Sequence, residues 1–202
     1  MNLRQQFGNI DIYLFDQLLK GRISPSISLL DAGCGDGRNL IYFLLHNFDV
    51  FAVDSNPQAI EQMRLLASRL APNLSSQNFL IADVAGMPFP SEKFDLVISS
   101  AVLHFAYDEQ HFDRMLNEMW RVLKPGGMLF ARLASSIGIE KLVKPTGEGH
   151  FFLPDGTERF LVNEEMLAAA AQRLGARRLE LLKTTNVENL RCMTTWVLGK
   201  ST

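Results

Sequence analysis

The segment that most constrains the fold of this chain is residues 27–40, where a short apolar run is followed by an acid and three alternate glycines. The pattern predicts a strand, a tight turn and then a helix that starts near Arg38. Gly33, Gly35 and Gly37 have no Cβ atom, so the main chain can adopt positive φ angles there and lie close to a ligand. We expect the first N–H groups and the dipole of the helix to point at the same place. Such a loop, after the first strand of an α/β sheet, is where nucleotide-like ligands bind.

The spacing of these glycines separates two classes of nucleotide site. From Asp31 to Gly37 the chain reads D-x-G-x-G-x-G, whereas dinucleotide-binding folds carry G-x-G-x-x-G. The spacing therefore argues against a nicotinamide enzyme. Glycine-rich turns also occur in loops that bind nothing, so the assignment depends on residues further along the chain.

Length, charge and cysteine content restrict the classes of function. The 202 residues favour a single domain, residues 1–202, that is long enough to bury a sizeable core. A net charge of −2, without a long basic run, argues against a nucleic-acid groove or an anionic membrane surface. We find no signal peptide and no apolar run of the roughly 20 residues that a membrane helix needs, so we expect a cytoplasmic protein. The two cysteines, Cys34 and Cys192, have neither disulfide nor metal-site spacing, and no metal is expected.

Strands and helices are predicted to alternate along the chain. Apolar runs predict strands at residues 27–30, 50–54, 79–83, 94–99, 128–133, 178–183 and 191–198. Amphipathic stretches predict helices at residues 9–20 and 38–46, after Ser55 or Asn56 as a cap, around residues 112–122, and after Asn163 as a cap. Residues 124–127, Lys-Pro-Gly-Gly, predict a turn before the fifth strand. This order is typical of an α/β fold with a doubly wound, mostly parallel sheet.

Two segments stand outside this alternation. The helix within residues 1–23 has two apolar faces, and is either a flap over the glycine loop or a helix packed on the body of the protein. Residues 134–162 are predicted to form a lid-like insertion, with a hairpin turn at residues 154–156, Pro-Asp-Gly. Three phenylalanines, Phe151, Phe152 and Phe160, give this insertion more apolar area than a solvated loop carries. Their rings either close over the site as a lid or pack on the core.

The second and third predicted strands each end in an acid. In a doubly wound sheet, the carboxyl ends of successive parallel strands lie along one edge, so Asp54 and Asp83 should lie beside the glycine loop. Asp54 comes 21 residues after Gly33, close to the spacing at which an acid accepts hydrogen bonds from ribose hydroxyls. Asp83 can accept a hydrogen bond from an exocyclic amine. Either acid alone could be a helix cap or a solvated strand end, but both together with the glycine loop favour a bound nucleoside.

Five motifs in order now resemble those of class I S-adenosylmethionine-dependent methyltransferases. They lie at residues 30–37, 53–54, 82–84, 94–104 and 122–127. The resemblance covers residues 24–133 and, in outline, the last helix and the last two strands. A narrower likeness to small tellurite-resistance and thiopurine-type methyltransferases rests on residues 35–39, Tyr42 and residues 49–50.

The resemblance implies a three-layer, Rossmann-like sandwich whose seven-stranded sheet is mostly parallel, with the last strand antiparallel. It implies S-adenosyl-L-methionine as cofactor, with its methionine part on the glycine loop, its ribose at Asp54, its adenine at Asp83 and Val84, and residues 100–103 beside the methyl. The full set of expected cofactor-binding residues is Asp31, Gly33, Cys34, Gly35, Gly37, Asn39, Asp54, Ser55, Asp83, Val84, Ser99 and Ser100.

Methyl transfer asks the protein mainly to hold two partners in line and to exclude water. A base is needed only if the acceptor atom keeps a tightly held proton. His104 is the candidate for that base, and the alternative is a histidine that caps the next helix or contacts the cofactor. Arg132 either holds an anionic acceptor or forms a structural ion pair. The candidate substrate residues are His104, Arg132, His150 and Phe152, whereas His111 is expected at the surface and Cys34 as a small loop residue.

The predicted function is transfer of a methyl group to a small-molecule acceptor, without nucleic-acid or membrane partners. Two alternatives stay open. The chain could bind S-adenosylmethionine as a regulator that never transfers a methyl group, or it could methylate a macromolecule. The net charge of −2 and the lack of an Asn-Pro-Pro-Tyr-type motif after the fourth strand disfavour a nucleic-acid base as acceptor. Arsenite methylation would need more cysteine ligands than the two present.

Overall fold

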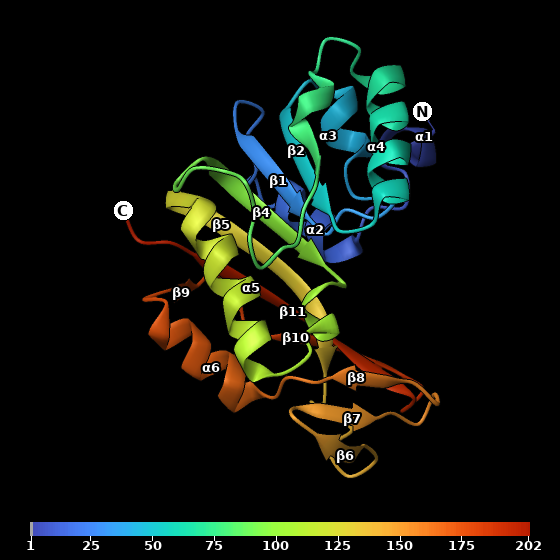
Figure 1. The fold of residues 1–202 in the computed structure, drawn as a ribbon, viewed down its shortest axis with the longest axis vertical. Coiled ribbons are helices and arrows are strands. Elements are labelled where there is room, and N and C mark those ends of the chain that lie inside the picture. Colours follow the sequence, from blue (N-terminus) through green and yellow to red (C-terminus); the bar gives the residue numbers. More distant parts are fainter. Residues whose placement is uncertain (1) are drawn as a thin grey trace.

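The computed structural model describes residues 2–202, which form a mostly parallel sheet with helices on both faces (Figure 1). The strands of this sheet are β1 (Ser28–Ala32), β2 (Asp49–Asp54), β3 (Phe79–Ile81), β4 (Phe94–Ser100), β5 (Leu123–Ser135), β9 (Arg177–Arg178), β10 (Lys183–Val187) and β11 (Arg191–Gly199). Their order across the sheet is β10-β11-β5-β4-β1-β2-β3, and the short β9 pairs with β11.

The topology creates one crevice at the carboxyl ends of the strands. β1 pairs in parallel with both β2 and β4, so the chain winds outward in two directions from this point. In open α/β sheets, ligands bind outside the strand ends where the winding reverses. β11 runs antiparallel between β5 and β10. The predicted seven-stranded, doubly wound sheet with an antiparallel last strand is therefore confirmed, and β9 adds a short extra strand.

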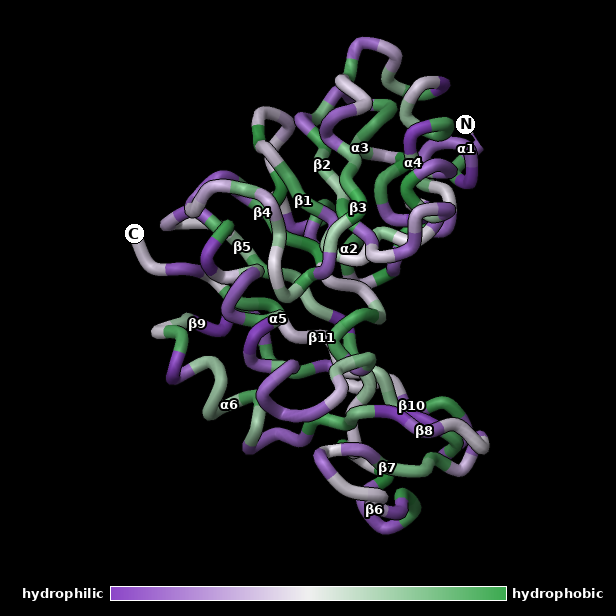
Figure 2. The backbone as a smooth tube through the Cα atoms, in the orientation of Figure 1, coloured by the Kyte–Doolittle hydropathy of each residue, from purple (hydrophilic) through white to green (hydrophobic). Residues whose placement is uncertain are grey.

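Helices cover the sheet because successive strand residues point to opposite faces. The α-helices are α1 (Leu3–Phe7), α2 (Ile12–Leu19), α3 (Ile41–Leu45), α4 (Pro57–Leu70), α5 (Glu109–Val122) and α6 (Glu164–Arg173), and the 3-10 turns are η1 (Ser76–Asn78) and η2 (Leu103–Phe105). Leu30 of β1 packs in one apolar cluster with Phe112 of α5, whereas Leu29 packs in a second cluster with Met63 of α4. Figure 2 shows the long hydrophobic stretches of the central strands β1, β4 and β5 between these layers.

Two predicted helix caps are confirmed. The side chain of Asn56, rather than that of Ser55, accepts a hydrogen bond from the Gln58 N–H at 3.0 Å and starts α4. Asn163 accepts from the Met166 N–H at 2.8 Å and starts α6. Both side chains satisfy N–H groups that a helix leaves without a partner in its first turn.

The helix after the glycine loop differs from its prediction. It begins at Ile41 rather than near Arg38, and α3 has only five residues. Gly37 has a φ of +77°, which no helical residue adopts, and the Leu40 N–H donates to its carbonyl at 2.9 Å to close a tight turn. The expectation that the helix starts near Arg38 is therefore wrong, and the turn of residues 37–40 separates the glycine loop from α3.

Two strand predictions also need correction. The strand predicted at residues 178–183 is absent, because β9 ends at Arg178 and β10 begins only at Lys183, with Glu180 held in side-chain contacts between them. β5 begins at Leu123, so the turn predicted at residues 124–127 is an irregularity inside the strand, where the pairing with β4 shifts register.

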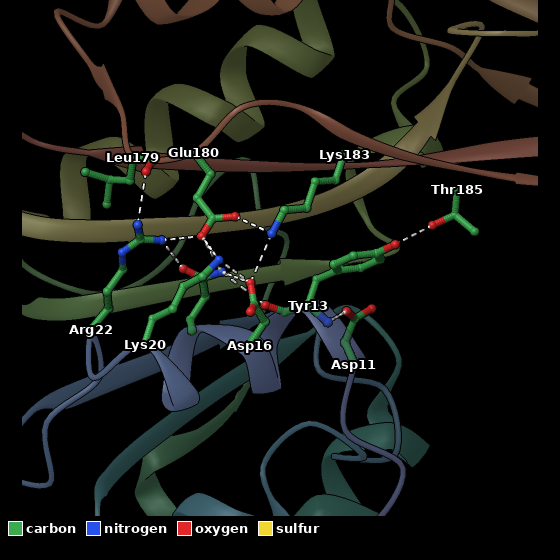
Figure 3. Close-up of polar contacts among 10 residues, drawn as sticks. Asp11, Tyr13, Asp16, Lys20, Arg22, Leu179, Glu180, Lys183 and Thr185 are labelled. Carbon is green, nitrogen blue, oxygen red and sulfur yellow. Dashed lines mark hydrogen bonds and ion pairs between the residues drawn. The ribbon is translucent and has the colours of Figure 1, made fainter.

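A polar network fastens α2 to the C-terminal part of the sheet (Figure 3). The Tyr13 hydroxyl lies 2.9 Å from the Thr185 hydroxyl. Glu180 is the centre of the network, and its partners are Gln17, Lys20, Arg22 and Lys183. The first turn of α2 also contacts the glycine loop, because the Asp11 N–H donates to Asn39 Oδ1 at 2.9 Å.

The insertion after β5 forms a small antiparallel sheet of β6 (Lys144–Gly147), β7 (His150–Phe152) and β8 (Glu158–Phe160). β7 and β8 are joined by a turn at Gly156, which has a φ of +82°, so the predicted hairpin is confirmed. Its three phenylalanines have different surroundings. Phe160 is fully buried and stacks on Phe112 of α5 at 5.4 Å, Phe151 joins a small apolar cluster, and Phe152 is exposed.

Candidate active site

The glycine loop after β1 frames a cavity, and its glycines serve two purposes. A Cβ atom on Gly33 would lie 2.5 Å from Val102, and one on Gly37 would lie 2.5 Å from the Met63 sulfur. These two glycines let the loop pack against its neighbours, and both have positive φ angles. A Cβ atom on Gly35 would meet nothing within 4 Å, so this part of the loop faces open space.

The cavity has a volume of about 420 Å³ and lies at the carboxyl ends of β1, β2 and β4 and just beyond the end of β3. Most of the residues predicted to bind a cofactor line it: Gly33, Cys34, Gly35, Asn39, Asp54, Ser55, Asp83, Val84 and Ser100. Asp31, Gly37 and Ser99 do not line it. A volume of this size is within the range of small-molecule and cofactor sites.

Asp54 connects the glycine loop to the end of β2. Its Oδ2 accepts a hydrogen bond from the Gly35 N–H and its Oδ1 accepts one from the Asn56 N–H, both at 2.9 Å. A carboxylate has about four acceptor positions, so it can still accept two further hydrogen bonds from a ligand. Oδ1 of Asp83 accepts a hydrogen bond from the Ala85 N–H at 2.7 Å. Asp83 also lines the cavity, where its remaining acceptor positions can bind a ligand.

The far wall of the cavity is apolar and aromatic, and the sequence analysis missed most of it. Val102, Phe105 and Met115 line it together with Tyr107, whose ring stacks on His111 at 4.4 Å. The expectation that His111 lies at the surface is wrong, because it is buried and lines the cavity. The signal that could have placed it is helical spacing, since His111 lies four residues before the buried Met115 on α5.

A buried carboxylate lies behind the loop. Asp31 is almost fully buried, and neither of its side-chain oxygens has a hydrogen-bond partner within residues 2–202. Burial raises its pKa to about 7, the nearby Asp54 and Asp36 act in the same direction, and Arg38 opposes them. Arg38 lines the cavity itself, where its Nη2 donates to the Ser100 hydroxyl at 3.1 Å. A ligand that brings positive charge to the loop would offset the burial of the Asp31 carboxylate.

A second cavity, of about 340 Å³, adjoins the first at Ala101, which lines both. Ala101 follows β4 with a φ of +65°, and its N–H donates to the Arg132 carbonyl at 2.7 Å. The charged and polar residues of the second cavity are His104, Arg132, Asp155, Thr157, Arg159 and Arg191. The first two of these were predicted as substrate residues, whereas Arg159 and Arg191 were missed.

The surroundings of His104 favour a hydrogen-bond donor over the predicted base. Burial, together with the positive charge of Arg159, lowers its pKa to about 4. Its Nδ1 accepts a hydrogen bond from the Ala134 N–H at 3.2 Å, so in the neutral ring the proton lies on Nε2. A histidine with so low a pKa is a weak proton acceptor near neutral pH.

Arg132 forms the structural ion pair that was one of its two predicted roles. Its Nη1 lies 2.8 Å from Oδ2 of Asp11, whose side chain is completely buried at the start of α2. The Nε of Arg132 is also buried, and no hydrogen-bond partner for it occurs in the part of the chain that the structure describes. The ion pair connects the start of α2 to β5, and it leaves the Nε–H group of Arg132 without a hydrogen-bond partner among the described residues.

His150 and Phe152, the other two predicted substrate residues, line neither of these cavities. The His150 ring packs edge-on against Phe160 at 5.9 Å. Phe152 lies in a separate hollow with Leu142 and Leu190. Cys34 is buried in the glycine loop, and burial raises the pKa of its thiol, as expected for a loop residue rather than a nucleophile.

Residues 2–202 contain neither a candidate metal site nor a candidate membrane span. No group of three histidine, cysteine, aspartate or glutamate side chains there could hold a metal ion. None of the helices in the same residues is long and apolar enough to span a membrane.

Comparison with known proteins places this geometry among methyltransferases. A family described as a methyltransferase domain matches residues 30–131, half of the chain. The uncharacterized methyltransferase YodH of Bacillus subtilis is 35% identical over 127 residues, 63% of this chain and 48% of the relative. The tRNA N(3)-methylcytidine methyltransferase Mettl2 of Drosophila melanogaster is 26% identical over 176 residues, 82% of this chain and 53% of the relative. The chain spans about half the length of these curated relatives.

The fold is shared with solved structures. The crystal structure of an S-adenosylmethionine-dependent methyltransferase from Methanosarcina mazei matches with a TM-score of 0.74 at 20% identity. The match covers 91% of this chain and 97% of that one.

Proposed function

Because the chain belongs to the class I S-adenosylmethionine-dependent methyltransferases, we propose that it transfers a methyl group from this cofactor to a small-molecule acceptor. The observation that carries the proposal is the pair of adjoining cavities. The first is framed by the glycine loop and the strand-end acids, and the second meets it at Ala101. A methyl donor in the first cavity and an acceptor in the second would face each other across this residue.

The residues of the first cavity suit the cofactor group by group. The two free acceptor positions of Asp54 suit ribose hydroxyls, and Asp83 beside the apolar Val84 suits an adenine with its exocyclic amine. Asp31 does not line the cavity, but its buried carboxylate lies behind the glycine loop, where a ligand that carries an ammonium and a sulfonium group would stabilise its ionised form. Arg38 can then bind the carboxylate of the methionine part.

When bound, this cofactor supplies an electrophilic methyl carbon on a positively charged sulfur. The contribution of the chain is to position the acceptor and to keep water away from the reacting atoms, which is the main requirement of such a transfer. Val102 and Phe105 provide an apolar wall beside Ala101. His104, with its proton on Nε2, donates a hydrogen bond that orients the acceptor, so we propose a binding role for it.

A small molecule is favoured over a macromolecule as the acceptor. The second cavity has the size of a small-molecule site, and the chain has a net charge of −2, which disfavours the phosphate contacts on which nucleic-acid binding depends. The tRNA-methylating relative matches most of this chain, so tRNA is the second candidate.

Calorimetry and a turnover screen test the proposal. The purified protein should bind S-adenosylmethionine and S-adenosylhomocysteine in preference to NAD, because Asp54 and Asp83 suit a single adenosine. Release of S-adenosylhomocysteine is then measured with thiols, oxyanions, phenols, small carboxylic acids and unmodified tRNA. Tight NAD binding without S-adenosylmethionine binding would contradict the proposal. Slow cofactor hydrolysis without a methylated product in any arm would favour a regulator, and turnover of tRNA alone would favour the macromolecular acceptor.

A further inference from the structure

The second cavity is positively charged, although the chain as a whole is acidic. It is lined by three arginines, Arg132, Arg159 and Arg191, and by a single carboxylate, Asp155. The net charge of the whole protein is −2. Like charges gathered around a cavity repel one another and are stabilised by a ligand of opposite charge. The lining therefore selects for an anion.

The three arginines differ in how far their charge is already neutralised. Arg132 is paired with the buried Asp11 at 2.8 Å. Arg191 is only loosely paired, since its Nη1 lies 3.8 Å from Asp155 Oδ2. Arg159 has no carboxylate within ion-pair distance among residues 2–202. Its Nη1 donates to the main-chain carbonyl of Glu158 at 2.7 Å, and Phe105 lies under its guanidinium at 5.4 Å.

The side chain of Arg159 is restrained, although its charge has no ion-pair partner among residues 2–202. The hydrogen bond to a main-chain oxygen and the aromatic ring beneath it restrict the side chain, which is half-buried on β8. β8 itself is anchored by Phe160, which is fully buried against α5. A restrained guanidinium loses less entropy when it forms a bidentate contact with a carboxylate.

The remaining wall of the cavity is apolar. Beside Ala101 it is formed by Ala134 of β5, Leu153 just after β7, Val187 of β10 and Met193 of β11. An anion that fills the cavity must therefore carry an apolar body beside its charged group. A free inorganic anion would leave these side chains without contacts.

No strong base among residues 2–202 lines the second cavity. His104 is a hydrogen-bond donor with a pKa lowered to about 4 by burial, and Asp155 is engaged by Thr157, whose hydroxyl donates to it at 2.6 Å. The cavity thus suits an acceptor that is already ionised at neutral pH. The oxygen of a carboxylate can form the bond to the methyl carbon while the carbon–sulfur bond breaks and S-adenosylhomocysteine leaves, so no proton has to be removed.

On the basis of the proposed methyl transfer, we propose that the acceptor is a small carboxylic acid with an apolar body, whose carboxylate is held by Arg159 and Arg191 in the second cavity. Arginine side chains also bind phosphate groups, so an organic phosphate is the alternative ligand of this site. A carboxylate is the better match, because Asp155 at the same site repels a doubly charged group more strongly.

Binding to the protein loaded with S-adenosylhomocysteine tests this inference. Calorimetry is carried out with phenylacetate and hexanoate, with the uncharged phenylacetamide and hexanamide of matched shape, and with phenyl phosphate. At least one acid should bind about tenfold or more tightly than its amide. Arg159→Gln should remove most of that preference, whereas Arg69→Gln, which removes an exposed charge on α4 away from the cavity, should leave it unchanged.

The outcomes separate this inference from the proposed function. Failure to bind S-adenosylhomocysteine counts against the methyltransferase proposal itself. With the cofactor product bound, equal affinity for acids and amides, or no binding of any acid, overturns the inference. A preference that survives in Arg159→Gln overturns the assignment to this arginine, and tighter binding of phenyl phosphate than of phenylacetate overturns the choice of a carboxylate. The affinity of Arg159→Gln for S-adenosylhomocysteine is measured in parallel as evidence that the variant is folded.

Discussion

Replacing Asp31 by Asn should change the pH dependence of stability of the cofactor-free protein. In the folded chain burial raises the pKa of this carboxyl from 3.8 to about 7, so it keeps its proton at pH values where the unfolded chain has lost it. The folded state is therefore progressively destabilised as the pH rises from about 4 to 7. At about 1.4 kcal/mol for each pH unit, the accumulated cost is on the order of 4 kcal/mol. An asparagine carries no charge at any pH and removes this dependence.

A second effect, the burial of the new amide, decides whether Asp31→Asn is more or less stable than the wild type at a given pH. A buried amide without a hydrogen-bond partner costs about 1–3 kcal/mol at every pH. Asp31→Asn should then be no more stable than the wild type near pH 4, but more stable near pH 8, where the cost of ionising Asp31 is larger. Urea unfolding of both proteins between pH 4 and 8, without cofactor, measures the difference directly.

Asp36→Asn is the matched control, because Asp36 lies in the same loop but is exposed. Its unfolding free energy should still fall as the pH rises from about 4 to 7, because Asp31 and its burial are retained. Parallel curves for the wild type and Asp31→Asn would refute the reasoning, since they would mean that Asp31 ionises as easily in the folded chain as in the unfolded one. Asp31→Asn should also bind S-adenosylmethionine more weakly at pH 8, which would make Asp31 a residue whose stability cost is offset by cofactor binding.

Three further predictions concern other parts of the molecule. Asp54→Ala should lower affinity for S-adenosylmethionine by about 1.5–3 kcal/mol in calorimetry, because charge-assisted hydrogen bonds are lost, and unchanged affinity in a folded variant would make Asp54 a structural residue only. Burial raises the pKa of Glu180, but hydrogen bonds, led by that from Lys183, outweigh it and lower the pKa to about 2. Its stabilisation is thus present above about pH 4.5 and lost as the pH falls towards 2. Glu180→Gln should cost about 1–2 kcal/mol in urea unfolding at pH 7 and clearly less at pH 2, and an equal cost at both would contradict the ion-pair network. Replacing residues 147–162 by a short glycine-serine linker should lower the melting temperature strongly, because it removes the buried Phe160, and a stable variant that binds cofactor but transfers no methyl group would favour the lid instead.

The cofactor side of the site follows from the sequence because its residues are local to strand ends. The glycine loop comes directly after a predicted strand, Asp54 and Asp83 each end one, and parallel strands bring their carboxyl ends to one edge. Knowing the order of strands and helices is enough to gather these groups, and the structure places all of them around one cavity. Predicting the cofactor side of the site therefore required no knowledge of contacts between distant segments of the chain.

Sequence periodicity fails where packing decides the local structure. The helix predicted from Arg38 begins at Ile41 because residues 37–40 form a tight turn, closed by the hydrogen bond from the Leu40 N–H to the Gly37 carbonyl. Gly37 in this turn packs closely against Met63 of α4. His111 was expected at the surface from its polar neighbours, but the ring of Tyr107 covers it. Both errors concern contacts between segments that the pattern of a single segment does not contain.

The acceptor side is harder to predict for the same reason. Arg159 belongs to the small sheet of the insertion and Arg191 begins the last strand of the main sheet, so their meeting depends on how the insertion folds back. Neither arginine lies in a motif or at a strand end that marks a site. Of the residues that line this cavity, only His104 and Arg132 were proposed from the sequence, and both lie on or just after predicted strands of the main sheet.

Arg132 shows that two roles weighed as alternatives in the sequence are compatible in the structure. Its partner Asp11 lies 121 residues away and neutralises a charge that would otherwise be costly to bury beside α2. The pairing leaves Nε buried and without a partner among the described residues, whereas the part of the side chain that stays exposed, 21%, is at the second cavity. A neutralised arginine attracts an anion weakly but still offers a fixed donor. In the proposed site, Arg159 would therefore supply the attraction for a carboxylate, and Arg132 would set the direction from which the acceptor meets the methyl group at Ala101.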